Sequence, residues 1–412
     1  MPGKKNLVVA ISNANHQKDI NYNIELNRWL LKAIGTWPRN KNTSLLDILF
    51  SRFLNVLHTS LISFLLIGTV LYILLDVQDI QAKLNKIGPV TFTIATLIKY
   101  WLLIFHESEI KHCLDHIEID WKGVRRQEDR RIMLESAHIG RRIVGISASL
   151  IFGALFLYRV IVPLNSPKMV IGNLTFRPLA YPVSKVIIDT RQTPANELIL
   201  LIQCICGFIM SAITVGSCSL VAICSLHACG QLKILMHWLN HLVNGHSNEN
   251  DTIDDRLRDI VKKHVRVLKY IVSFIPGLKI YTDAMSDRHT SDLAFFQFHH
   301  MYGKFYGWNH ISTINMFAYI ILLTSFVFNI FIICYIGELL AHECKKMAES
   351  TYMINWYQLK GKKALSLILI ISMSLSSSRL TAGKFIELSL KSFSDVIKTS
   401  VGYLNMLRAI TS

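Results

Sequence analysis

Long uncharged apolar runs alternate along the chain with shorter polar segments that are rich in lysine and arginine. The run INMFAYIILLTSFVFNIFIICYIG, for example, contains no charged side chain. A membrane-spanning helix needs about 20 predominantly apolar residues at a rise of 1.5 Å each. The pattern therefore predicts an all-α polytopic membrane protein, with clear spans near 54–75, 87–105, 143–163, 198–226 and 311–337.

The loops between these spans differ in basic content, which predicts their sidedness. Loops 1–52 and 106–142 hold eight Lys or Arg residues each, and loops 227–270 and 338–384 hold seven each. The alternate loops, 76–90 and 164–196, hold two and four. Because Lys/Arg-rich loops stay in the cytoplasm, the N-terminus is predicted to be cytoplasmic.

An even number of crossings must join two loops on the same side of the membrane, which requires one further span. Loops 227–270 and 338–384 are both predicted to be cytoplasmic, yet only one clear span lies between them. A fifth, poorly defined span is therefore predicted within 270–310. Its sequence suits a helix badly, since Pro276 and Gly277 break helices.

The chain ends on two unusual segments. LSLILIISM, from Leu365 to Met373, is too short to span and predicts a buried cytoplasmic or interfacial helix. The stretch from Gly383 to Arg408 is long enough to cross as a seventh helix of about 37 Å. Wound as a helix, it places polar residues in one stripe: Lys384, Glu387, Lys391, Asp395, Lys398, Gly402 and Asn405.

Two interpretations of this final helix remain open on the sequence alone. It either lies amphipathically on the membrane surface or crosses and lines an aqueous path, since charges inside a membrane must face a water-filled cavity or a bundle interior. If it crosses, the C-terminus is extracellular. The outer end then carries an apolar group able to close a pore by dewetting: Tyr403, Met406, Leu407 and Ile410.

Composition and motifs narrow the function further. The chain is 51% hydrophobic with a mean hydropathy of +0.35 and a net charge of +16. The basic residues are spread through the loops, which favours contact with membrane lipid and disfavours nucleic acid as a partner. Eight cysteines suggest no disulfide framework, and the pairs His112/His116 and His237/His241 lack converging partners for a metal. Catalytic motifs are missing, so we expect neither an enzyme nor a cofactor; a secondary transporter is the alternative.

Two long stretches resemble the insect odorant receptor family. They are the ending TAGKFIELSLKSFSDVIKTSVGYLNMLR and the run TSFVFNIFIICYIGELL. Shorter agreements are IEIDW, HACGQL and RPLAYP, which occur in the family's order. In these stretches the sequence is most similar to the odorant receptors of ants, bees and wasps.

The resemblance implies a single membrane domain, 1–410, with seven spans and a split seventh helix. One half would belong to a cytoplasmic anchor segment, 338–380, and the other would line a pore. It implies an odorant-binding subunit of a ligand-gated non-selective cation channel, assembled as a heterotetramer with a shared co-receptor in the plasma membrane of olfactory sensory neurons. A gustatory-type chemoreceptor is the nearest alternative.

Site residues follow from the same resemblance. The pore constriction would lie at Met406, with Ile410 one turn outward and Asn405 and Tyr403 beside it. The pocket for a small apolar odorant or pheromone would lie in the outer half of the bundle, where ordinary helix packing is the competing interpretation for each residue. The pocket candidates are Phe92, Thr96, Phe152, Tyr158, Met210, Met316 and Tyr319.

Overall fold

The computed structural model describes residues 15–39, 43–171, 174–243, 245, 252–283, 313–359, 363–376, 381–382 and 386–411. Nearly all of them are helical, as the apolar runs predicted. The elements are α1 (His16–Ala33), α2 (Leu45–Leu71), η1 (Tyr72–Asp76), α3 (Ile80–Phe105), α4 (Glu107–Lys122), α5 (Gln127–Phe156), η2 (Leu157–Ile161), α6 (Val162–Asn165), β1 (Met169–Ile171), β2 (Leu174–Phe176), α7 (Ala195–Asn240), α8 (Ile253–Asp283), α10 (Thr313–Met353), η4 (Trp356–Gln358), α11 (Lys363–Ser376), β3 (Thr381–Ala382), β4 (Ile386–Glu387) and α12 (Leu390–Thr411).

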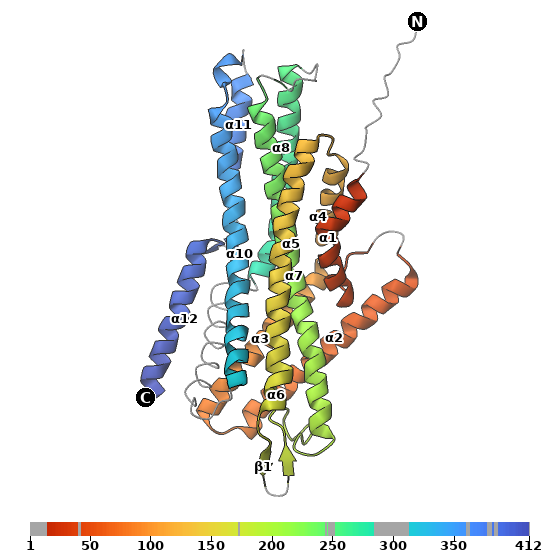
Figure 1. The fold of residues 1–412 in the computed structure, drawn as a ribbon, viewed down its shortest axis with the longest axis vertical. Coiled ribbons are helices and arrows are strands. Elements are labelled where there is room, and N and C mark those ends of the chain that lie inside the picture. Colours follow the sequence, from red (N-terminus) through yellow and green to blue (C-terminus); the bar gives the residue numbers. More distant parts are fainter. Residues whose placement is uncertain are drawn as a thin grey trace.

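The long helices α5, α7 and α10 run side by side along most of the elongated molecule (Figure 1). We call the end that carries α6 and the antiparallel β1–β2 pair the hairpin end, and the end that carries α11 the α11 end. Helix α7 forms the centre, and every residue from 210 to 232 is buried. A helix with apolar or small side chains on every face is suited to this central position, because its Gly, Ala, Ser and Cys residues let neighbouring helices approach closely.

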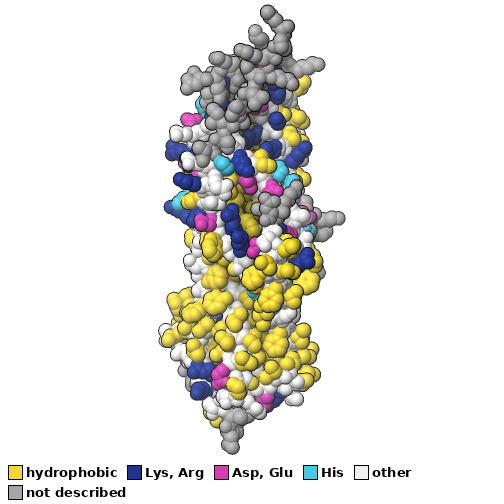
Figure 2. Space-filling model, turned by 90° about the vertical axis from the view of Figure 1, so that its right-hand side faces the viewer, with side chains coloured by type: hydrophobic (Ala, Val, Ile, Leu, Met, Phe, Trp, Pro, Cys, Tyr) yellow, Lys and Arg dark blue, Asp and Glu magenta, His cyan; other side chains and the backbone are white. Residues whose placement is uncertain are grey.

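The surface carries a membrane-like belt. Figure 2 shows hydrophobic side chains gathered over the half toward the hairpin end, with most charged side chains toward the α11 end. Five of the described helical stretches are long and apolar enough to cross a membrane: Leu45–Asp76, Lys86–Phe105, Gln127–Asn165, Ala195–Asn240 and Thr313–Met353. Large exposed side chains such as Phe53, Trp101 and Phe156 are compatible with lipid around this belt.

The first long helix begins earlier than the span predicted at residue 54. Helix α2 starts at Leu45, where the Ser44 hydroxyl accepts a hydrogen bond from the Leu46 amide at 3.3 Å. That side chain is a typical N-cap. The first turns expose the apolar side chains of Leu45, Leu49 and Phe53, which therefore add to the apolar surface of the molecule.

Near the predicted fifth span, the expectation of a break at Pro276 and Gly277 was wrong. Helix α8 continues through both residues to Asp283. An internal proline removes one hydrogen bond and crowds the preceding turn, a local cost that neighbouring turns can absorb. The remainder of the predicted range, 284–310, lies outside the described residues.

The final helix is shorter than the predicted one. Residues 386–387 form strand β4, paired with β3, and α12 begins only at Leu390. The predicted helical stripe therefore does not extend back to Glu387, and its placement on the final helix was wrong. The start is fixed by Ser389, whose hydroxyl accepts a hydrogen bond from the Ser392 amide at 3.2 Å.

Candidate functional site

The predicted pocket residues come from five elements of the bundle. Phe92 and Thr96 lie on α3, Phe152 on α5, Tyr158 on η2, Met210 on α7, and Met316 and Tyr319 on α10. Met210 and Thr96 are the most deeply buried of them, at 0% and 1% exposed. Phe152 and Met316 are only partly buried.

Five of these residues meet in one hydrophobic core. Phe92, Tyr158, Met210 and Tyr319 belong to it and Phe152 packs against it; we call these five the apolar cluster. The Tyr158 and Tyr319 rings lie edge to face with centroids 5.9 Å apart. A second ring contact joins α3 to α10, where Phe92 lies edge to face against Phe326 with centroids 5.1 Å apart. The hydrophobic core therefore includes candidates from α3, α5, η2, α7 and α10.

The other two candidates are placed differently. The Thr96 hydroxyl donates to the Phe92 carbonyl at 2.8 Å, so its polar group is satisfied within its own helix. Met316 is not part of the apolar cluster. Among the seven candidates, these two have the weakest structural connection to the cluster.

Arg159 is a site residue that sequence reasoning missed. An arginine near the end of the predicted span 143–163 could extend its side chain to water, but Arg159 is only 1% exposed and lies inside the bundle. Nη1 donates to the Gln203 backbone carbonyl at 2.9 Å, and Nη2 lies 3.3 Å from the Met210 sulfur. The guanidinium carbon also stacks over the Tyr181 ring, 4.4 Å from its centroid.

Two local features turn Arg159 inward. It lies in η2, a π-helical turn, which changes the direction of side chains relative to the preceding α-helix and is often found at functional sites. On the facing helix, Gly207 leaves room for the arginine, since a Cβ there would lie 2.5 Å from Arg159 Cδ. A glycine opposite an arginine was the available sequence signal, but the pairing is visible only in three dimensions.

Tyr181 closes this region from the loop between β2 and α7. Its backbone exchanges two hydrogen bonds with the Gln203 side chain, at 2.6 and 3.3 Å, and its hydroxyl donates to the Pro89 carbonyl at 3.4 Å. Tyr181 is 2% exposed. The loop motif RPLAYP therefore belongs to the site, because an aromatic residue in a polar loop is held by α3 and α7.

The predicted pore residues lie on α12, which stands beside α10 and apart from the rest of the bundle (Figure 1). Met406 is 61% exposed, and Asn405 is also exposed. Tyr403 and Ile410 belong to the same helix, but their side chains lie outside the described residues.

Helix α12 is attached to α10 near its own beginning. The Phe393 ring lies edge to face against Phe331 with centroids 5.5 Å apart, and the Leu390 amide donates to a Glu338 carboxylate oxygen at 3.3 Å. Leu388 packs directly against Gly337 on α10. This attachment links α12 to the middle of α10 and leaves the face around Met406 uncovered by the described part of the chain.

Toward the α11 end, helices α4, α7 and α8 enclose a charged network. Asp120 pairs with His227 at 3.0 Å and with Arg266 at 3.1 Å. Burial raises the pKa of Asp120, but the hydrogen bond from His227 and the charge of Arg266 outweigh it and hold this pKa below its usual value. On α8, His264 is 2% exposed, and burial lowers its pKa to about 4.

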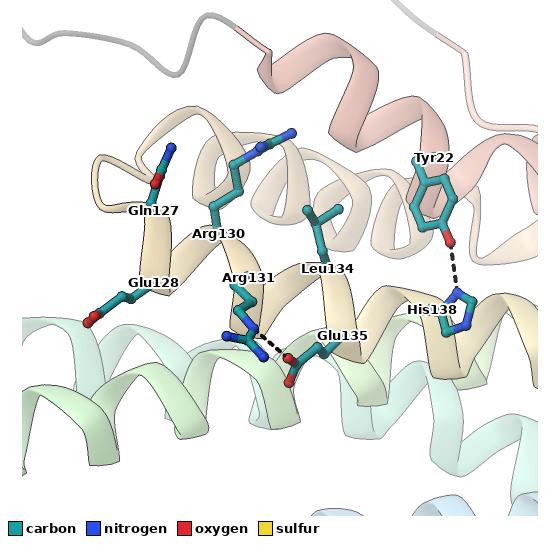
Figure 3. A pocket seen from close by; sticks show the side chains of 8 residues that line it. All are labelled: Tyr22, Gln127, Glu128, Arg130, Arg131, Leu134, Glu135 and His138. Carbon is teal, nitrogen blue, oxygen red and sulfur yellow. Dashed lines mark hydrogen bonds and ion pairs between the residues drawn. The ribbon is translucent and has the colours of Figure 1, made fainter.

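Between α1 and α5 lies an open cavity of about 670 Å³ (Figure 3). Its wall carries pairs that satisfy each other: Tyr22 with His138 at 2.9 Å, and Arg131 with Glu135 at 3.1 Å. Arg130, also on the wall, binds Asp19 of α1 through two hydrogen bonds. These polar groups bind one another, and the pairs that join Tyr22 to His138 and Asp19 to Arg130 hold α1 against α5. Among the residues that line the cavity, we find no arrangement of side chains suited to catalysis.

Together, the apolar belt, the long buried helix α7 and the terminal helix attached through α10 define a polytopic helical membrane protein. The family model of the 7tm Odorant receptor matches residues 79–401, and the chain belongs to this family.

Solved structures show the same fold. The insect olfactory receptor OR5 from Machilis hrabei in complex with eugenol is similar with a TM-score of 0.79 at 14% identity, covering 96% of this chain and 100% of that one. A second structure of the insect olfactory receptor OR5 from Machilis hrabei has a TM-score of 0.78 at 14% identity, covering 95% of this chain and 99% of that one. A comparison with curated protein sequences finds no match. The fold is thus that of the seven-helix insect olfactory receptors.

Proposed function

We propose that this protein is the odorant-binding subunit of a heteromeric, ligand-gated, non-selective cation channel. The family membership and the fold support an odorant receptor. The observation that carries the channel proposal is α12, a long helix attached through α10 with its Met406 face exposed. A helix with a polar stripe and an uncovered face is suited to an aqueous path shared with other subunits.

The proposed ligand is a small, largely apolar odorant. The apolar cluster consists of aromatic and methionine side chains in the hydrophobic core, the types of residue that usually line a small-molecule site. One similar structure is described as a complex with eugenol, an odorant-sized molecule, which supports a ligand of this scale.

The proposed orientation places the N-terminus and the α11 end in the cytoplasm. Basic loops support it, since the loops predicted to be cytoplasmic hold seven or eight Lys or Arg residues each. The hairpin end and the C-terminus are then extracellular, in the plasma membrane of olfactory sensory neurons. The apolar cluster would lie in the outer half of the bundle.

In this orientation α12 forms the proposed pore-lining half of the seventh helix, and the neighbouring subunits include a shared co-receptor. Met406 is proposed as the constriction, with Ile410 outward of it and Asn405 and Tyr403 nearby. Helix α11 and the end of α10, within the proposed anchor segment 338–380, would hold the subunits together at the cytoplasmic end.

Voltage-clamp recording tests this function. Cells expressing the chain with the co-receptor should give odorant-evoked currents that reverse near 0 mV in mixed Na⁺ and K⁺ solutions, and cells expressing either subunit with an inactive partner serve as controls. A Met406→Cys variant should become sensitive to a thiol reagent applied during opening, whereas the exposed Val401→Cys variant on the same helix serves as its matched control. Odorant-dependent uptake of a solute without such a current would contradict the proposal.

A further inference from the structure

The guanidinium of Arg159 contacts Met210 of the apolar cluster, and its hydrogen bonding is incomplete. Nη1 and Nη2 have acceptors, but Nε is fully buried without a hydrogen-bond partner. The acceptors that it has are neutral, a backbone carbonyl, a thioether sulfur and an aromatic face. No carboxylate of the described residues forms an ion pair with it.

Such a charge is costly to bury. Removing a cation from water costs several kcal/mol unless an opposite charge and full hydrogen bonding offset the loss. Within membrane-spanning segments, ionisable residues are rare and mark functional sites for the same reason. The neutral contacts of Arg159 offset part of this cost, which leaves a site prepared for an anion.

The position of the charge defines the shape of a matching ligand. Nη2 reaches the sulfur of Met210, and the residue before Arg159 is Tyr158, whose ring packs against Tyr319. The cation therefore lies at the edge of the apolar cluster, with Tyr181 covering its other side. A molecule that enters between these helices would meet the guanidinium at one end and methionine and aromatic side chains along the rest of its length.

We infer that the ligand is a small amphiphilic carboxylate, an odorant-sized acid whose anionic end pairs with Arg159 and whose chain packs against the apolar cluster. A carboxylate only accepts hydrogen bonds and matches the planar donors of a guanidinium. Esters, alcohols and hydrocarbons of the same length offer no charge to offset the buried cation. The inference rests on the proposed function and narrows its ligand class.

Binding to the purified full chain tests the inference without any channel activity. Octanoate, methyl octanoate and acetate are compared by the rise that each produces in the thermal unfolding temperature at neutral pH. We expect octanoate to bind at least about tenfold more tightly than its methyl ester, and acetate to give no rise at millimolar concentration. Equal binding of octanoate and its ester, or equal effects of acetate and octanoate, would overturn the inference.

Three variants locate the effect. Arg159→Gln removes the charge and should weaken octanoate binding by about 30-fold or more while changing that of the ester by less than about threefold. Arg159→Lys keeps the charge but not the planar donors, so octanoate should still bind more tightly than the ester, although less tightly than to the original chain. Arg191→Gln, which breaks a surface pair with Asp189, is the matched control and should leave octanoate binding unchanged.

Two further measurements distinguish a folding defect from a loss of ligand binding and from a loss of channel activity. The unfolding temperature of each variant without ligand shows whether it folds, and a parallel loss for acid and ester in Arg159→Gln would mean a structural role and overturn the inference. Currents recorded with the co-receptor address the proposed function independently. If octanoate binds through Arg159 but opens no channel, the proposed function fails and the ligand assignment stands.

Discussion

The attachment of α12 to α10 depends on the absence of a side chain at Gly337. A Cβ added there would lie 2.6 Å from Leu388 Cβ and closer still to the Leu388 carbonyl oxygen, about 0.8 Å or more short of an ordinary contact at 3.4 Å. One obstacle is backbone, so no side-chain rotation relieves it. Gly337→Ala must therefore push the segment before α12 away from α10.

The expected magnitude is the cost of overpacking, about 1–3 kcal/mol. The gain of about 1 kcal/mol from alanine inside a helix applies equally to the docked and undocked states, because α10 is helical in both, so it changes overall stability and not docking. We expect a loss of at least about 1 kcal/mol in the docking of α12, which corresponds to an undocked-to-docked ratio that is larger by at least about fivefold. Gly153→Ala on α5 is the control, because a Cβ there meets nothing within 4 Å and only the helix-propensity gain remains.

Crosslinking measures the docking directly. Phe393 packs against native Cys334 of α10, so a Phe393→Cys background should form a disulfide under mild oxidation. Adding Gly337→Ala should slow this crosslinking by at least about fivefold, and adding Gly153→Ala should leave it unchanged. Equal crosslinking rates in both variants, together with equal or higher unfolding temperatures, would refute the packing argument.

Three other predictions test separate parts of the molecule. His264 has a pKa of about 4 in the folded chain against 6.5 for the free side chain, so the unfolded chain takes up this proton first as pH falls. The free energy of unfolding should therefore be at its full value above about pH 6.5 and about 2 kcal/mol lower at pH 5. Thermal unfolding of His264→Gln should show a weaker dependence on pH. Asp19 is 3% exposed and accepts two arginine hydrogen bonds at 2.7 and 2.8 Å, so Asp19→Asn should lower the free energy of unfolding by about 1–3 kcal/mol, whereas Glu135→Gln in an exposed pair should change it by less than about 0.5 kcal/mol. Gly207→Ala should displace Arg159 and weaken octanoate binding by about tenfold without a matching loss for methyl octanoate; equal binding by both forms of the chain would show that the close approach is not needed.

The all-helical fold was predictable because lipid-facing and core helices share one strong signal, a long uncharged apolar run. Helix ends were less predictable, since they depend on single contacts. Ser389 starts α12 and Ser44 starts α2, and both positions differ from the ends suggested by hydropathy. The strand at Glu387 was hidden because a polar residue at helical spacing looks the same whether or not its backbone is helical.

The candidate site shows the same limit. Apolar members such as Met210 and Tyr319 were named from the family resemblance, and the structure places both in one cluster. Arg159 could not be recognised from the sequence, because hydropathy places it near a span end but does not say which side of the helix it occupies. Its inward direction depends on a π-helical turn and on Gly207 across the interface, neither of which has a pattern in the local sequence.

The most direct test of the central claim is recording from excised membrane patches that contain this chain and its co-receptor. Patches are perfused without ATP or GTP, so that only the subunits and the ligand are present. The proposed ligand-gated channel should give odorant-evoked, non-selective cation current within milliseconds and keep it through repeated applications. A current that disappears on excision and returns only with nucleotide would contradict the account.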